Sequence, residues 1–125
     1  MIKPIRTLII ASPGRLRDSL GVLVRASQEL NLIGQADTGL SGLEMVVREQ
    51  PDLALLDSRL PGEAAWSLLS VLKHSYPEVA CWMLVVTSKD EAHARAAGAD
   101  EVLAPGLTVD TLIQLARRKR ESDGL

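Results

Sequence analysis

Aromatic residues and cysteine are scarce in this 125-residue chain, which has two Trp, one Tyr, no Phe and one Cys. Proteins that hold single-stranded nucleic acid stack its bases on aromatic side chains, so this composition argues against such a partner. The single Cys81 cannot form an internal disulfide. Its place inside an apolar run predicts a reduced, buried and unreactive thiol.

An excess of positive charge is also absent, because the formal net charge is −2. Binding to a phosphate backbone needs a basic face, so we expect no direct contact with nucleic acid. The only basic cluster, residues 117–120, comes near the end of the last expected helix. Cations are favourable at a helix C-terminus, and we interpret the cluster in this way rather than as a binding patch.

Long apolar runs are missing as well. No stretch approaches the length that spans a bilayer, and the first residues lack the apolar core of a secretory signal. We therefore expect a cytoplasmic protein without membrane contact. The length fits one domain with a single modest core, which we place at residues 1–120, followed by a tail or linker start at 121–125.

Five apolar segments alternate with helical patterns, which is typical of a parallel sheet covered by helices on both faces. We expect strands near residues 6–11, 31–36, 52–57, 80–87 and 100–103. The fourth is the most hydrophobic, and this predicts a central position. The expected fold class is α/β, a doubly wound five-stranded parallel sheet, (βα)5, with strand order 2-1-3-4-5 in a flavodoxin-like three-layer sandwich.

Capping signals predict where the first two helices begin. Ser12 is expected as the N-cap of the first helix, with Pro13 at its first helical position. The second is expected to begin at Ser41, in a capping box with Glu44. Apolar residues at helical spacing would face the core, namely Leu16, Leu20, Leu23 and Leu30 in the first helix and Leu43, Val46 and Val47 in the second.

The remaining helices have less distinctive starts. A third is expected from about 63 to 75, and a short, alanine-rich fourth from 89 to 97. The last is expected to open at Thr108.

Asp57 ends the third apolar run, which breaks at once into Ser58-Arg59-Leu60-Pro61-Gly62. In open α/β sheets the working groups lie just outside the carboxyl ends of the strands, so this carboxylate occupies a functional position. Ala11 and Ser12 leave the first strand at the same crevice. A simpler interpretation also stands, in which Asp57 only caps the following loop through backbone N–H groups.

Several short motifs together carry a family resemblance over nearly the whole chain. They are Leu-Leu-Asp57 followed by Leu60-Pro61-Gly62, Pro51-Asp52 before that strand, Thr87 at the end of the fourth strand, and Gly98-Ala99-Asp100 before the fifth. In these features the chain resembles the receiver domains of bacterial two-component response regulators. The resemblance implies that Asp57 accepts a phosphoryl group from a histidine kinase and that Thr87 is the hydroxyl that signals its presence.

Other positions depart from the family pattern. Ala11 and Ser12 stand where the family has an acidic pair that binds Mg²⁺, and Ala104 stands where it has a lysine before a proline. Val102 replaces an aromatic switch residue, and the stretch from Thr87 to Gly98 is a few residues shorter than usual, which shortens the fourth helix. One aspartate alone is a poor magnesium site, so we expect no metal cofactor.

Phosphoryl transfer depends on positioning and on charges around the transferred oxygens. Removing one such electrostatic element costs on the order of 10²-fold to 10³-fold in rate. We therefore favour a pseudo-receiver that signals through protein–protein contacts. The alternative is a working phospho-acceptor at Asp57, with self-catalysed phosphoryl transfer as its only enzymatic activity. A small-ligand carrier on the same fold is a third hypothesis, but no phosphate-cradling loop or metal-type His supports it.

The surroundings of Asp57 leave two further questions open. Arg59 and Lys89 leave the same edge of the sheet, and either could supply the missing positive charge, although solvated charges are the simpler interpretation. His74 and His93 are expected at the surface. By resemblance, the partner is a histidine kinase or another signalling protein, and a homodimer would use the fourth helix, fifth strand and fifth helix.

Overall fold

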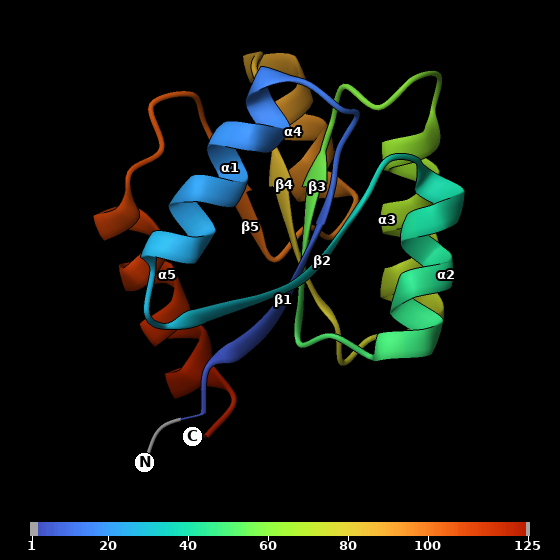
Figure 1. Ribbon diagram of the computed structural model, residues 1–125. Coiled ribbons are helices and arrows are strands. Elements are labelled where there is room, and N and C mark those ends of the chain that lie inside the picture. Colours follow the sequence, from blue (N-terminus) through green and yellow to red (C-terminus); the bar gives the residue numbers. More distant parts are fainter. Residues whose placement is uncertain (1–2, 125) are drawn as a thin grey trace.

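A computed structural model describes residues 3–124 (Figure 1), in which strands and helices alternate along the chain. The strands are β1 (Ile5–Ile10), β2 (Leu30–Ala36), β3 (Leu53–Asp57), β4 (Ala80–Leu84) and β5 (Glu101–Leu103). The helices are α1 (Arg15–Ala26), α2 (Gly39–Glu49), α3 (Ala64–Ser75), α4 (Ser88–Ala96) and α5 (Val109–Ser122). No helix in the described part of the chain is long and apolar enough to cross a membrane.

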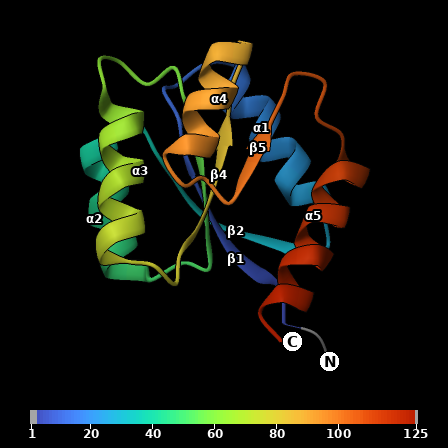
Figure 2. The same ribbon diagram turned by 180° about the vertical axis from the view of Figure 1, so that it is seen from behind.

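All strand pairs are parallel, and the order β2-β1-β3-β4-β5 confirms the predicted topology. Helices α1 and α5 cover one face of the sheet, while α2, α3 and α4 contribute to the core on the other (Figures 1 and 2). The result is the expected three-layer sandwich.

Strand β3 occupies the middle of the sheet, and each of its residues is buried. Leu53 and Leu55 pack into the core beside α1 and α5, whereas Ala54 and Leu56 pack into the core beside α2 and α3. A strand covered on both faces has no polar side, which explains its uninterrupted apolar run.

Strand β4 is shorter than predicted. It lies inside the sheet between β3 and β5, as the predicted order places it, but it ends at Leu84, so the expected extent to residue 87 was wrong. The physical reason is its partner: β5 has only three residues, and Leu84 opposite Leu103 is their last pair. Val85 continues the apolar run but is buried beyond the end of the strand.

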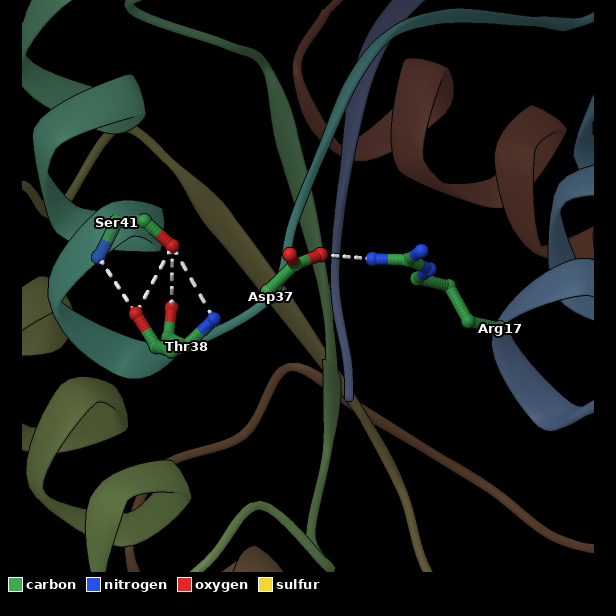
Figure 3. A network of polar contacts seen from close by, with 4 residues as sticks. All are labelled: Arg17, Asp37, Thr38 and Ser41. Carbon is green, nitrogen blue, oxygen red and sulfur yellow. Dashed lines mark hydrogen bonds and ion pairs between the residues drawn. The ribbon is translucent and has the colours of Figure 1, made fainter. Parts of the chain in front are cut away.

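Two predicted helix starts were also wrong. Helix α1 begins after Gly14, which has φ 151°, a conformation that favours glycine, and Ser12 and Pro13 precede it in the loop. Helix α2 has Thr38 as its N-cap. The Ser41 N–H donates to Thr38 Oγ1 over 3.0 Å, and the Thr38 N–H donates to Ser41 Oγ over 3.1 Å (Figure 3). Ser41 therefore closes the capping box instead of opening it.

Smaller differences concern the helix faces and ends. Leu30 begins β2 and does not extend α1, and Val47 is 50% exposed although it was expected to face the core. Helix α2 instead presses Gly42 against the sheet, where a Cβ would lie 2.8 Å from Ile10 Cδ1. Thr108 caps α5 as predicted, and this helix continues to Ser122, into the segment expected as a tail.

The basic cluster 117–120 is paired within the domain. Arg120 is buried, pairs with Glu29 and donates to the Lys3 carbonyl over 2.8 Å. The remaining three basic residues form the ion pairs Arg117–Glu29, Arg118–Glu101 and Lys119–Asp123. These basic side chains are thus used in contacts within the domain.

Candidate functional site

The strand exits meet at one edge of the sheet. Ile10 pairs with Leu56, and Leu84 pairs with both Asp57 and Leu103, so the ends of β1, β3, β4 and β5 lie level. This register brings the exits that carry Ala11, Asp57 and Ala104 to the same edge, as the sequence predicts.

Asp57 is buried, and its side chain is 8% exposed. Its Oδ1 accepts a hydrogen bond from the backbone N–H of Arg59 over 2.9 Å and lies 3.5 Å from Arg59 Nε. The structure thus shows both the loop-capping hydrogen bond and the pairing with Arg59. Lys89 makes no ion pair with Asp57. Oδ2 of Asp57 has no hydrogen-bond partner among residues 3–124.

The guanidinium of Arg59 is a weak electrostatic partner. Its side chain is 51% exposed, so water screens the pair and its contribution to stability is about 0–1 kcal/mol. The backbone bond does not depend on that charge. Asp57 is thus a nearly enclosed anion held mainly through one of its two oxygens.

The described side chains around Asp57 offer few oxygen ligands for a magnesium ion. Ala11 is fully buried and offers only a methyl group, and Ser12 is half-buried. Within residues 3–124, no three His, Cys, Asp or Glu side chains gather where they could hold a metal ion. Mg²⁺ demands near-ideal octahedral oxygen ligation and loses its water reluctantly.

A second carboxylate at this edge, Asp37, is already paired. It follows β2 and forms an ion pair with Arg17 of α1, which reaches toward it past β1 (Figure 3). The Arg17 side chain is only 18% exposed. Sequence reasoning missed this pair; an acid directly after the second expected strand and a cation early in the first helix were the available signals.

Thr87 was expected at the end of the fourth strand. It lies instead beyond the end of β4, which closes at Leu84. It is the N-cap of α4, where its Oγ1 accepts from the Asp90 N–H over 3.0 Å. The Thr87 hydroxyl accepts this hydrogen bond and keeps its own proton, which it can donate to another group. Its role as the switch hydroxyl stays a prediction. Val102 is half-buried against the core on the α3 side.

A pocket of about 280 Å³ opens beside Asp57, between α1 and the loop that follows β5. Asp57 and Arg59 line it together with Ala104, the position at which the resemblance predicts a lysine. Most of its wall is apolar, including Leu16, Leu20 and Leu23 of α1 and Leu103, Pro105 and Leu107 from β5 and the following loop. The sequence analysis did not find this pocket.

The remaining candidate side chains lie elsewhere. His93 stacks on Trp66 with ring centroids 3.9 Å apart, which joins α4 to α3, and His74 is exposed. Cys81 is buried as predicted, and burial raises its pKa from 9.0 to about 12. Its thiol is therefore protonated and poorly reactive.

Comparison with known proteins identifies one family. A sequence model described as the response regulator receiver domain matches residues 8–117. Response regulator GacA of Pseudomonas aeruginosa is 24% identical over 91% of the chain and 54% of its own length. A response regulatory protein of Vibrio cholerae is 30% identical over 93% of the chain and 50% of its own length. The chain thus spans about half the length of these two relatives.

Solved structures agree on the fold. A signal receiver domain from Mycobacterium tuberculosis superposes with a TM-score of 0.83 at 20% identity, over 96% of this chain and 98% of that one. A CheY-like receiver domain protein from Methanospirillum hungatei gives a TM-score of 0.79 at 21% identity, over 96% of each chain.

Proposed function

The chain belongs to the response regulator receiver domains of two-component signalling, and we propose that it is an atypical member that signals through protein–protein contacts. In this proposal Asp57 accepts a phosphoryl group weakly or not at all in the presence of Mg²⁺. The observation that carries it is the isolation of Asp57, whose carboxylate has Arg59 as its only partner among the described residues.

The first support is the acid content of the crevice. With Ala11 in place of an acid and Asp37 engaged by Arg17, Asp57 has no second free carboxylate beside it at the described strand exits. A divalent ion there would lose hydration without the ligands that offset this loss.

The second support is the missing cation after β5. Ala104 faces the pocket where the family's lysine would approach the transferred oxygens, and no lysine is among the pocket's described lining residues. Arg59 does not substitute directly, since it pairs with the acceptor carboxylate itself. Stabilisation of developing charge is usually the largest catalytic contribution in such reactions, so phosphorylation would be slow.

The proposed output is contact through α4, β5 and α5, with a histidine kinase, another signalling protein or a second copy as the partner. Among the residues of α4, only Ala94 is buried, and Ala92 and Ala96 are exposed. Small exposed side chains let another helix approach closely. A monomer mass by light scattering at high protein concentration would exclude the homodimer.

The alternative, a working phospho-acceptor, is favoured by one observation: Asp57 lies at the exit of β3 and lines an accessible pocket. Incubation with Mg²⁺ and acetyl phosphate, followed by intact mass spectrometry, separates the two functions. We expect no stoichiometric phosphoryl adduct. An adduct that forms readily and is lost in Asp57→Asn would overturn the proposal.

A matched gain-of-function variant makes a negative result informative. Ser12→Asp combined with Ala104→Lys returns one acid and the cation at positions that are half-buried and exposed, respectively. We expect this double variant to form the adduct faster than the natural chain. Equal rates would mean that these two positions do not limit the chemistry.

A further inference from the structure

The pocket beside Asp57 has features that receiver chemistry does not use. We propose that it binds a small apolar amine, whose ammonium group pairs with Oδ2 of Asp57 while its hydrocarbon body lies against α1. This site needs neither Mg²⁺ nor a phosphoryl group, so it goes beyond the function proposed above.

The pocket walls define the body of the ligand. Leu16, Leu20 and Leu23 come from α1, and Leu103 and Leu107 face them from β5 and its following loop. The volume of about 280 Å³ lies just below the range of about 300–1,000 Å³ that is usual for ligand pockets, so a compact molecule is expected.

Asp57 defines the polar group of the ligand. Its side chain is 8% exposed, its Oδ1 accepts from the Arg59 N–H, and its Oδ2 has no hydrogen-bond partner among residues 3–124 but is open to solvent. An ammonium group at Oδ2 would add a charge-assisted hydrogen bond to a carboxylate that the protein covers on most sides. A ligand carboxylate could pair with Arg59 but would then lie close to the anion of Asp57.

Ala104 keeps the space beside Asp57 open for a ligand. A long cationic side chain at this position would enter the space beside Asp57 and compete with an external cation. With alanine there, the wall is short and the space stays open. One substitution thus removes a catalytic charge of the family and leaves room for a charged ligand.

The test compares three molecules with one ring and different head groups: cyclohexylmethylamine, cyclohexylmethanol and cyclohexanecarboxylate. Each is titrated into the full chain with EDTA and no phosphodonor, and backbone amide shifts are followed by NMR. We expect saturable shifts around Ser19, Leu103 and Leu107 with the amine, and about tenfold weaker binding of the alcohol and the acid. The alcohol can still donate a hydrogen bond to Asp57 but carries no positive charge, and the acid places a second anion beside it.

Variants locate the site. Asp57→Asn should lower the affinity for the amine to that for the alcohol, whereas Asp110→Asn, an exposed acid outside the pocket, should leave it unchanged. Ser19→Phe places a ring at the exposed mouth and should weaken amine binding without disturbing the core. If Asp57→Asn does not fold, the head-group comparison on the natural chain still decides.

Three results would overturn the inference: no saturable shifts with the amine, equal binding of all three molecules, or full amine affinity in folded Asp57→Asn. None of these depends on phosphorylation. If the amine does not bind, the proposed signalling function still stands. If an acyl phosphate forms at Asp57, the signalling proposal fails, but the amine titration still tests the binding site.

Discussion

Because Asp57 has only one, weakly paired partner among the described residues, its replacement should change the free energy of unfolding little. In Asp57→Asn, an amide oxygen can still accept from the Arg59 N–H, and only the pairing with a half-exposed guanidinium is lost, which is worth about 0–1 kcal/mol. Removing a buried charge offsets part of this loss. We therefore expect the free energy of unfolding to stay within about 1 kcal/mol of the natural chain.

Asp57→Ala serves as the comparison, because it also removes the 2.9 Å hydrogen bond to the Arg59 N–H. A neutral hydrogen bond contributes about 1 kcal/mol net, so this variant should be about 1 kcal/mol less stable than Asp57→Asn. Urea unfolding measures both differences, and the slope of each transition should stay the same.

A double-mutant cycle with Arg59→Ala completes the test. Since the ion pair is half-exposed, its coupling energy should stay below about 1 kcal/mol. A gain above about 2 kcal/mol in Asp57→Asn would show that other acids repel this carboxylate. That result, or a coupling of comparable size with Arg59, would refute the picture of a lone and weakly paired anion.

Three further outcomes follow from the fold. Thr87→Ala should cost about 1 kcal/mol of stability through loss of the α4 cap, and Thr87→Ser should restore it, as measured by urea unfolding. Cys81 should resist thiol reagents in the native state at pH 8 and react in denaturant. Its pKa is about 12 in the folded state and 9.0 when exposed, so only the unfolded state loses the thiol proton above pH 9, and the free energy of unfolding should fall as the pH rises further. Gly42→Ala should cost about 1–3 kcal/mol by forcing a Cβ against Ile10. Gly21→Ala is its matched control: the new Cβ meets only the movable ends of long side chains and should be neutral or stabilising, and equal losses in the two variants would contradict this packing.

The sheet was predictable because its central strands are covered on both faces. Leu53 to Leu56 form an unbroken apolar run, and such a run can be satisfied only between two helical layers. The same logic failed at the end of β4, where Val85 is buried beyond the strand and donates only one backbone hydrogen bond to the sheet, to the Leu103 carbonyl over 3.0 Å. Apolar character predicts burial, but strand length also depends on how much of β5 is available as a partner.

The helix starts show a second limit of local patterns. Ser41 has the residue type of an N-cap, yet Thr38 three residues earlier takes that place and uses Ser41 as its partner. At α1, the positive φ of Gly14 places the start of the helix beyond the Ser12-Pro13 signal. Ser12 and Ser41 both have side chains that can cap a helix. Which residue becomes the N-cap depends on the backbone geometry of the preceding loop.

Asp57 was found from its place after the third apolar run, but its surroundings were not. The pair Arg17–Asp37 joins a helix to the exit of a distant strand, and the pocket is assembled from α1, the end of β3, β4 and the loop after β5. Such contacts depend on tertiary packing, which residue spacing does not specify. The pairing of Asp57 with Arg59 was one of the interpretations that the sequence left open, because the two residues are neighbours in one turn.

The most direct test of the central claim is the effect of Mg²⁺ on the stability of the natural chain and of Asp57→Asn. A site at Asp57 that is filled by Mg²⁺ at about 100 times its dissociation constant would raise the free energy of unfolding by about 2.7 kcal/mol. The crevice described here lacks the ligands for such a site, so we predict the same small change in both proteins. A stabilisation of about 2.7 kcal/mol in the natural chain that disappears in Asp57→Asn would contradict the account.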